Sequence, residues 1–420
     1  MKPNSTKGLT ATLSALALVA TGCGGGSTTS APTVDPTASL DEIDTSNELD
    51  GVVPLPTTVD DRIRAVFDKY AHLDAPSGER VHFLGQPGVS DERLFRVKAV
   101  FEQLVTDAPG TSLGADKRGV LDAVAALDTT IVVVEEQQAF DLSDAMVASF
   151  TQLFDGLYAS VDCSMVVQEG SPEYLLPDPA IDGTLLETSG ILLRFGLGAT
   201  VPDFAEALTL ARLHAESQGL YRPVAGQQQG QADADYLGLI LSVYYGVWGH
   251  DPSGQGTSGG SGEYDFCDRS TLQAGDPGAL ALIESFFAPS QAFPAYLASS
   301  FSGTFEMQFD PALAYTHRSR YLERAGFRGD ITGRINGNEL DNTFLGGDLA
   351  DQFEGRGGAD RIEGDRGADE AFFTGLSSEY TIIAVDSTVT RVTDTVPGRD
   401  GADDVRQVTR LHFSDQIIDL

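Results

Sequence analysis

Glycine recurs every nine residues near the end of this chain, and this period limits the possible folds of the segment more than any other feature. Cutting at these glycines gives four consecutive units, residues 337–345, 346–354, 355–363 and 364–372. The sixth position of the units holds an acid or its amide: Asn342, Asp351, Asp360 and Asp369. The eighth position is apolar: Phe344, Phe353, Ile362 and Ala371.

This pattern predicts one tight turn and one very short strand in each unit. Glycine allows backbone angles that are closed to other residues, and the apolar side chain points inward to stack on its neighbours. A carboxylate at the turn, beside the carbonyl oxygens of adjacent turns, offers the oxygen ligands that calcium prefers. Because successive turns lie on opposite faces, we expect Asn342 to pair with Asp360, and Asp351 with Asp369.

The repeat resembles the nonapeptide G-G-x-G-x-D-x-U-x of hemolysin-type (RTX) calcium-binding proteins. The resemblance implies a short parallel β-roll over residues 326–375, with Ca²⁺ as its cofactor. Calcium ligands are expected at Asn342, Asp348, Asp351, Asp360, Asp365 and Asp369. Leu340 and Leu349 replace the usual fourth-position glycine and Asn342 is neutral, so we expect a modest affinity, about 10⁻⁴ to 10⁻³ M. The alternative is a loop rich in glycine and aspartate without metal.

Residues 376–420 are similar to the β-rich segment that often closes such repeats. The stretch 379–390 contains two β-branched runs, which predict strands. An acidic turn at 400–405 precedes an apolar and aromatic run at 410–415. We expect this segment to cap the open end of the roll.

The N-terminus has the pattern of an export signal. Lys2 and Lys7 precede an apolar stretch, residues 9–20, that is too short to span a membrane. Residues 20–23, Ala-Thr-Gly-Cys, resemble the bacterial lipobox, whose cysteine receives the lipid, so residues 1–23 are expected to be a lipoprotein signal ending at Cys23. Residues 24–55 are rich in Gly, Ser, Thr and Pro and predict a flexible tether. We expect a membrane-anchored lipoprotein, periplasmic or on the cell surface; the alternative is a secreted protein.

The formal net charge of −35 excludes nucleic acid as a partner, because phosphates would be repelled. It suits a protein that takes up divalent cations or lives in salty water; the alternative is that the acidic residues simply keep the chain soluble. The apolar fraction of 41% is ordinary for a globular protein. No apolar run in the sequence approaches the roughly 20 residues of a spanning helix.

Residues 56–325 predict one α+β body. The spacing of apolar residues and the β-branched runs indicate the elements. Asp203 with Glu206 indicates a capping box, and Asp276 before Pro277 indicates a helix start. Helices are expected at 58–72, 89–105, 115–127, 185–195, 203–218, 235–248 and 277–287, a break at 226–231, and strands at 81–84, 130–134 and 301–309.

No intact catalytic motif occurs in this body. The sequence lacks the HExxH zinc motif and G-x-S-x-G, and no histidine has a second histidine three or four residues away. The stretches 81–86, 89–92, 114–117, 244–249 and 315–322 resemble a set of uncharacterised exported bacterial proteins. Some members carry a Glu and two His on the helix matching 185–195, where this chain has Glu187, Gly190 and Leu193.

Two functions therefore remain open for the protein. The first is a calcium-stabilised lipoprotein with a binding or structural role. The alternative is a divergent or inactive metal-dependent hydrolase of the metallopeptidase kind, which a cluster of His214, His250 or His317 with carboxylates would favour. Cys163 and Cys267 would enter an oxidising compartment, where they form either a disulfide or two buried thiols.

Overall fold

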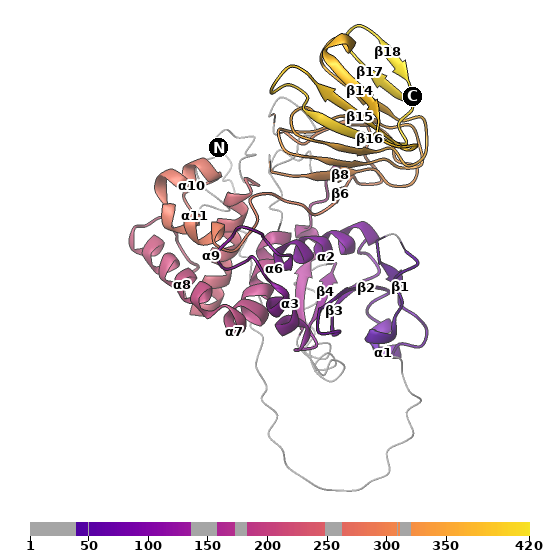
Figure 1. Ribbon diagram of the computed structural model, residues 1–420. Coiled ribbons are helices and arrows are strands. Elements are labelled where there is room, and N and C mark those ends of the chain that lie inside the picture. The colour runs from indigo at the N-terminus through magenta and orange to yellow at the C-terminus, as the bar shows by residue number, and fades with distance from the viewer. Residues whose placement is uncertain are drawn as a thin grey trace, which may run out of the picture.

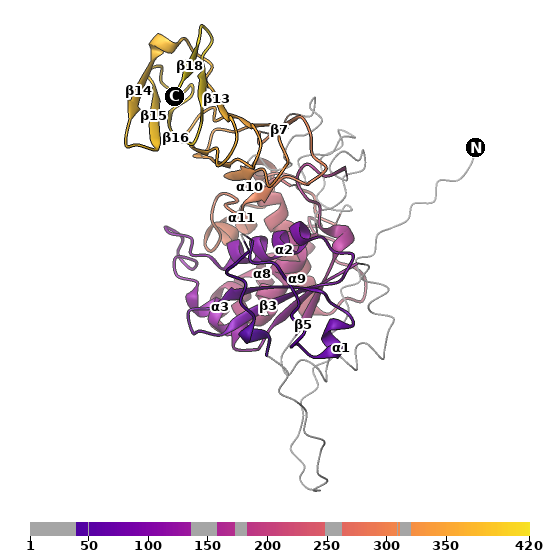
Figure 2. The same cartoon turned by 90° about the vertical axis from the view of Figure 1, so that its right-hand side faces the viewer.

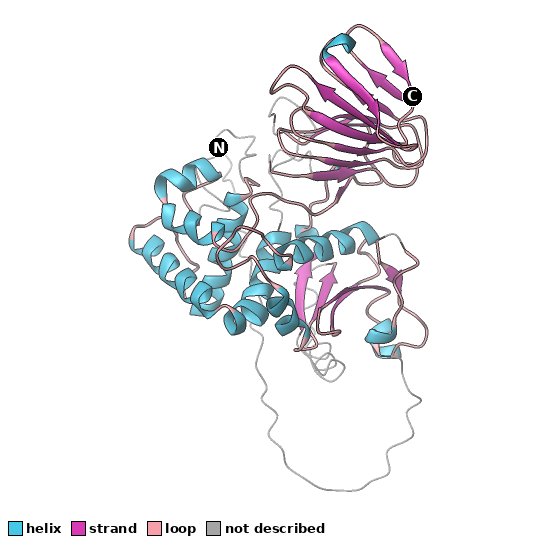
Figure 3. Ribbon diagram, viewed as in Figure 1, coloured by secondary structure: helices cyan, strands magenta, loops and turns pink. Residues whose placement is uncertain are grey.

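The computed structural model describes residues 39–48, 50–135, 158–172, 183–247, 263–308, 310 and 321–420. Helices gather around one sheet in the first part of the chain, and strands dominate the last part (Figure 3). The strand-rich part lies at one end of the molecule in both views (Figure 1 and Figure 2). The expected α+β class is confirmed. The signal segment with Cys23 lies outside the described residues.

The first part of the chain contains a five-stranded sheet in sequence order, in which β1, β2 and β3 pair antiparallel and β3, β4 and β5 pair parallel. Strand β4, which lies between β3 and β5, is buried at every position, as a parallel strand covered on both faces must be. Ile131 and Val133 join the main core, whereas Val132 and Val134 join a second cluster on the opposite face. The bounds are β1 (Val53–Pro54), β2 (Lys69–Asp74), β3 (Arg80–Gly85), β4 (Thr130–Val134) and β5 (Tyr158–Asp162).

Two helices begin at residues whose side chains cap them, Ser90 and, as the sequence predicted, Asp276. The Ser90 hydroxyl accepts a hydrogen bond from Arg93 N (3.3 Å) at the start of α2, and the Asp276 carboxylate accepts one from Ala279 N (3.1 Å) at the start of α11. The helices are α1 (Asp61–Arg64), α2 (Asp91–Val105), α3 (Arg118–Ala125), α6 (Thr184–Leu192), α7 (Gly198–Thr200), α8 (Pro202–Ser217), α9 (Gln229–Tyr244), α10 (Arg269–Gly275) and α11 (Pro277–Glu284), with a π-helical turn at Leu193–Leu197 and 3-10 turns at Leu40–Glu42, Cys163–Met165 and Ser377–Glu379.

Three local predictions for this part were wrong. The expected helix at 58–72 is only the short α1 followed by β2, because pairing of β2 with β3 overrides the helical spacing of the apolar residues. The expected capping box at Asp203 does not form, since Pro202 is already the first helical residue and Val201 precedes it. Helix α9 begins at Gln229, inside the expected break.

The nine-residue period reappears as a row of very short strands. Each strand begins one period after the previous one, and consecutive strands alternate between two sheets. Each strand therefore pairs in parallel with the next strand but one along the chain, as in Thr343 with Arg361 and Gln352 with Glu370. The strands are β9 (Arg334–Asn336), β10 (Thr343–Leu345), β11 (Gln352–Glu354), β12 (Arg361–Glu363) and β13 (Glu370–Phe372).

Other strands extend the two sheets on both sides of this row. The earlier strands β6 (Ala295–Tyr296), β7 (Thr304–Glu306) and β8 (Arg324–Gly326) pair in parallel with one another or with the repeat strands, although the sequence assigned residues 56–325 to the body. The later strands are β14 (Tyr380–Ala384), β15 (Val389–Asp394), β16 (Ala402–Arg406), β17 (Arg410–His412) and β18 (Ile417–Asp419). Of these, β16 and β17 pair in parallel with β12 and β13.

The eighth-position side chains fill the space between the two sheets. Phe344 and Phe353 come from different sheets, and their ring centroids lie 5.8 Å apart. Ile362 and Ala371 continue this core, and all four side chains are at most 1% exposed. The core residues thus place the sixth position, two positions earlier in each unit, at the turn between the sheets.

Candidate metal centre

The sixth-position side chains of the four repeats are all buried: Asn342, Asp351, Asp360 and Asp369 are at most 2% exposed. Hydrogen bonds link them in alternate units. Asn342 N donates to Asp360 Oδ1 (2.7 Å), and Asp351 N donates to Asp369 Oδ1 (2.8 Å). The structure therefore brings together the two pairs that the alternation of turns predicted.

Several oxygens of these carboxyl groups have no hydrogen-bond partner. Asp351 Oδ1, Asp360 Oδ2 and Asp369 Oδ2 are buried without one among the described residues. Burying a carboxylate without full compensation is costly, so the neutral form is favoured. Burial raises the pKa of Asp351, and burial together with the charge of Asp351 raises the pKa of Asp369 to about 7. These oxygens are hard ligands of the kind that calcium takes.

The glycine at the first position makes room for the acid at the sixth. A Cβ on Gly355 would lie 2.0 Å from Asp360 Oδ2, and a Cβ on Gly364 would lie 2.5 Å from Asp369 Oδ2. The fourth-position Gly358 has φ +107°, and its Cβ would lie 2.4 Å from the Leu340 carbonyl oxygen. In these two units the glycine and the acid are therefore one packing requirement, whereas a Cβ on Gly346 would instead lie 2.1 Å from the Gly364 carbonyl oxygen.

Asn342 differs from the aspartates because the protein satisfies its amide. Asn342 Oδ1 accepts from Asn338 N (2.9 Å), and Nδ2 donates to Asn338 Oδ1 (3.1 Å) and the Leu322 carbonyl oxygen (3.4 Å). A neutral amide that donates to carbonyl oxygens takes the place that a cation would need. Of the two predicted pairs, Asp351 with Asp369 is the one with two carboxyl groups.

The structure does not bring two expected ligands, Asp348 and Asp365, into this buried row. The Asp348 side chain is 42% exposed and accepts from Arg366 Nη1 (3.0 Å). Asp365 is exposed and has φ +60°. Both lie on the outside of the turns, where water competes for their oxygens.

One buried acid of this region was missed by the sequence reasoning. Asp403 is 1% exposed, and its Oδ1 accepts a hydrogen bond from Asp360 N (3.0 Å). Burial raises the pKa of both carboxyl groups well above the usual range, and the charge of Asp403 raises that of Asp360 further. The signal was present in the sequence, since Gly398, Gly401 and Asp403 have the spacing of positions one, four and six.

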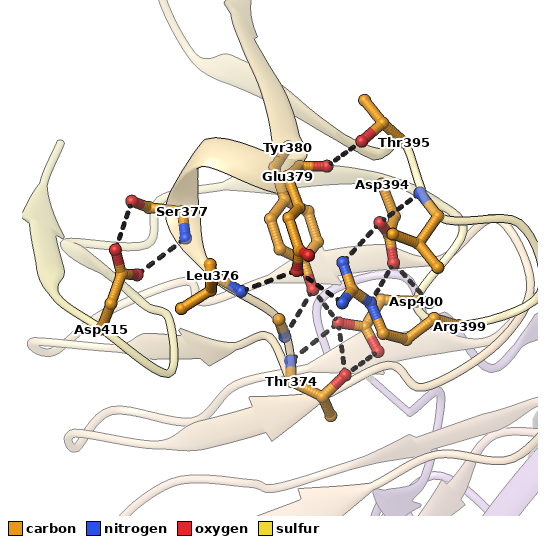
Figure 4. A network of polar contacts seen from close by, with 12 residues as sticks. Thr374, Leu376, Ser377, Glu379, Tyr380, Asp394, Thr395, Arg399, Asp400 and Asp415 are labelled. Atoms are coloured by element: carbon orange, nitrogen blue, oxygen red, sulfur yellow. Dashed lines mark hydrogen bonds and ion pairs between the residues drawn. The ribbon is translucent and has the colours of Figure 1, made fainter.

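A polar network fastens the turn that carries Asp403 (Figure 4). The Asp400 carboxylate accepts from Thr374 N (2.7 Å), from Thr374 Oγ1 (2.8 Å) and from the Tyr380 hydroxyl. Arg399 donates to Asp394 (Nε–Oδ2 2.6 Å) and to Glu379 (Nη1–Oε2 2.7 Å). These contacts join the end of the repeats to the hairpin of β14 and β15.

Within the described ranges, no three His, Cys, Asp or Glu side chains converge to hold a metal ion. A site of two carboxyl groups completed by backbone carbonyl oxygens has only two acidic side chains, so it would not form such a cluster of three. Carbonyl oxygens are present at these turns: a Cβ on Gly347 would meet those of Gly329 (2.8 Å) and Ile331 (3.3 Å). Calcium accepts backbone carbonyls among its six to eight oxygen ligands.

In the described part, two buried acids of the body have no basic side chain bound to them. One is Asp276, whose carboxylate accepts hydrogen bonds from the Tyr236 and Tyr264 hydroxyls (3.2 and 2.9 Å), and the other is Glu187. Burial, with a contribution from the charge of Asp235, raises its pKa to about 8. The helical positions expected for imidazole ligands are Gly190 and Leu193, and His214 is exposed on α8. His250 and His317 lie outside the described residues.

The two cysteines of the body are buried free thiols, so of the two alternatives that the sequence left open, the structure has the thiols and not the disulfide. Arg93 Nη1 lies 3.4 Å from Cys163 Sγ. No helix in the described part of the chain has the length and apolar composition needed to cross a membrane.

Comparisons with known proteins return no match to a family model and none to a curated protein. The resemblance to hemolysin-type repeats therefore rests on the nine-residue pattern and not on overall similarity.

Proposed function

We propose that this chain is an exported lipoprotein whose C-terminal strands form a β-roll that binds Ca²⁺ and is stabilised by it. The observation that carries the proposal is the buried pair Asp351 and Asp369, each with an oxygen that lacks a partner among the described residues. The body of residues 56–325 would then serve a binding or structural role.

Charge supports a divalent cation at this pair. When both are ionised, the carboxyl groups of Asp351 and Asp369 repel each other, and one divalent cation neutralises both. A buried site lined by carboxylate and carbonyl oxygens favours Ca²⁺ over Mg²⁺, which keeps several water molecules and demands octahedral geometry. The alternation of strands between two sheets, with parallel pairing of every second strand, supports the β-roll.

The same chemistry gives the cation a role in folding after export. Where calcium is scarce, the repelling carboxyl groups disfavour closure of the turns. Where calcium is abundant, its binding energy becomes folding energy. Residues 1–23 support export, and a lipid on Cys23 would anchor the chain to a membrane through the segment that follows it. The prediction of a tether up to residue 55 was wrong at its end, because Ile43 is buried and β1 pairs with β2 in the sheet. The secreted form and the metal-dependent hydrolase stay as alternative predictions.

Calcium titration by calorimetry tests the proposal. The full-length chain is compared with the double variant Asp351→Asn and Asp369→Asn, and with Asp348→Asn, which removes an exposed acid. We expect the double variant to lose the binding at this pair, and so to give a smaller heat than the parent chain, and the Asp348→Asn control to keep it. Equal heats for all three proteins would overturn the proposal.

A further inference from the structure

Residues 398–406 repeat the nine-residue pattern outside the run of four units. Gly398 and Gly401 stand at positions one and four, Asp403 at position six and Val405 at position eight. Residues 373–397 separate this copy from the fourth unit. They contain the antiparallel hairpin of β14 and β15.

The displaced copy stacks on the third unit as the next turn of the same row. Strand β16 pairs in parallel with β12 through Arg361 and Asp404, just as β12 pairs with β10 through Arg361 and Thr343. Asp404 N donates to the Asp360 carbonyl oxygen (2.8 Å), which repeats the bond from Arg361 N to the Asn342 carbonyl (2.8 Å).

Packing at this turn requires the glycine of the pattern. Gly401 has φ +78°, and a Cβ there would lie 1.7 Å from the Gly358 carbonyl oxygen. Val405 is 1% exposed and lies beside Ile362 in the strand register. Residues 398–406 thus meet the same steric conditions as the contiguous units.

The acid of the copy takes the same relation to Asp360 that Asp369 has to Asp351. Asp360 N donates to Asp403 Oδ1 (3.0 Å), as Asp351 N donates to Asp369 Oδ1 (2.8 Å). Asp360 is 2% exposed, and its Oδ2 has no partner among the described residues. An unpartnered, buried oxygen thus lies at the junction between the third unit and the copy.

We propose that Asp360 and Asp403 form a second calcium site, which clasps residues 398–406 to the third repeat. This inference rests on the proposed calcium binding of the repeats and adds a site to which a distant segment contributes. The two sites are then Asp351 with Asp369 in one row of turns and Asp360 with Asp403 in the other.

The other row ends differently, so the chain has one clasp and not two. Thr409 occupies the place next to Asp369, where its N donates to the Asp369 carbonyl oxygen (2.8 Å) and its Oγ1 donates to the same oxygen (2.9 Å). A hydroxyl that is already donating there replaces the carboxyl group. The row of Asp351 and Asp369 therefore ends beyond Asp369 without a further cation site.

The clasp adds to the network that already holds this turn. Asp400, on the same turn as Asp403, is bound to Thr374 and Tyr380 (Figure 4). Calcium between Asp360 and Asp403 would link the same turn to the third repeat. The turn would then be held from two sides, by the cation and by the contacts of Asp400. Loss of the cation would release the copy before the first two units.

The number of calcium ions bound per chain tests the clasp. We compare the full-length chain with Asp403→Asn and with Asp404→Asn, a matched control on the same strand whose acid pairs with Arg391 (2.7 Å) at the surface. We expect two ions for the parent chain, two for Asp404→Asn and one for Asp403→Asn. Two ions bound to Asp403→Asn would overturn the clasp, whereas no binding to the parent chain would overturn the proposed function itself.

Hydrogen exchange gives a readout that does not depend on folding of the Asp403 variant. In Asp351→Asn, where the first site is broken and the clasp is intact, saturating calcium should slow exchange of the amides at 402–406 by about tenfold or more. If calcium did not change the exchange of the amides at 402–406 in either the parent chain or this variant, the result would contradict the clasp.

Discussion

Buried charges are handled differently in the body and in the C-terminal repeats. In the body, the Arg96 guanidinium forms two hydrogen bonds to the Glu169 carboxylate (3.0 and 3.2 Å), and Arg212 pairs with Asp233. Among the described residues, no ion pair reaches the buried repeat acids Asp351, Asp360 and Asp369. The body therefore supplies partners for its buried acids, which are basic side chains or, at Asp276, tyrosine hydroxyls, with Glu187 as the exception. The cation that we propose for the repeats would come from outside.

The largest expected effect lies in the body. Arg96→Met removes the partner of Glu169 and leaves a carboxylate that is 2% exposed without its counter-ion. Breaking a buried pair in this way costs about 3–5 kcal/mol of unfolding free energy. Denaturant unfolding should show this loss equally in calcium and in EDTA. If calcium reversed this loss of unfolding free energy, the contrast between the body and the repeats would be wrong.

The next effect is a pH dependence that reverses with calcium. The pKa of Asp369 is raised to about 7, against about 3.9 in an unfolded chain, so its contribution to stability is full below about pH 4 and is lost as pH rises through 7. In EDTA the melting temperature of the repeats should fall by several degrees between pH 5 and pH 8. In excess calcium it should rise, because the cation needs ionised ligands.

The double variant Asp351→Asn and Asp369→Asn serves as the control for this pH experiment. It lacks two of the titrating acids, so the fall in melting temperature between pH 5 and pH 8 in EDTA should be smaller than in the parent chain. Asp360 and Asp403, whose pKa values are also raised, account for the dependence that stays. A parent chain whose melting temperature in EDTA does not change with pH would contradict the assignment of raised pKa values to these acids.

The smallest effect is a change at the first repeat. Asn342→Asp removes amide hydrogen bonds to Leu322 and Asn338, which should cost about 1–2 kcal/mol in EDTA. It also places a carboxyl group beside Asp360, so calcium binding should become tighter or gain a site. Calorimetric titration and melting in EDTA measure both changes. If the variant matched the parent chain in both calcium binding and melting temperature, the amide of Asn342 would have no effect on either property.

The sequence predicted the repeats closely because two strict requirements coincide there. The inward Phe344 and Phe353 and the glycine beside each acid fix the register of every turn, so the nine-residue period became a row of equally spaced strands. The helix expected at 58–72 failed because the spacing of Ile63, Phe67 and Tyr70 also fits a short helix followed by a strand that pairs with β3.

Asp403 was missed for a different reason. Its pattern is separated from the fourth unit by residues 373–397, and only the return of the chain after the β14–β15 hairpin places it beside Asp360. The strands β6 to β8 were likewise assigned to the body, because the earlier segment lacks the regular glycine and acid. A local sequence period does not predict which distant strands pair in the tertiary structure, so these contacts could not be foreseen from the repeat alone.

Hydrogen exchange of the full-length chain, with calcium and with EDTA, compares the two regions most directly. Calcium should slow the amides of β10 to β13 and of β16 by about tenfold or more, and it should leave those of β3 and β4 unchanged. Equal exchange of the repeat strands in calcium and in EDTA would contradict a role for the cation in holding them.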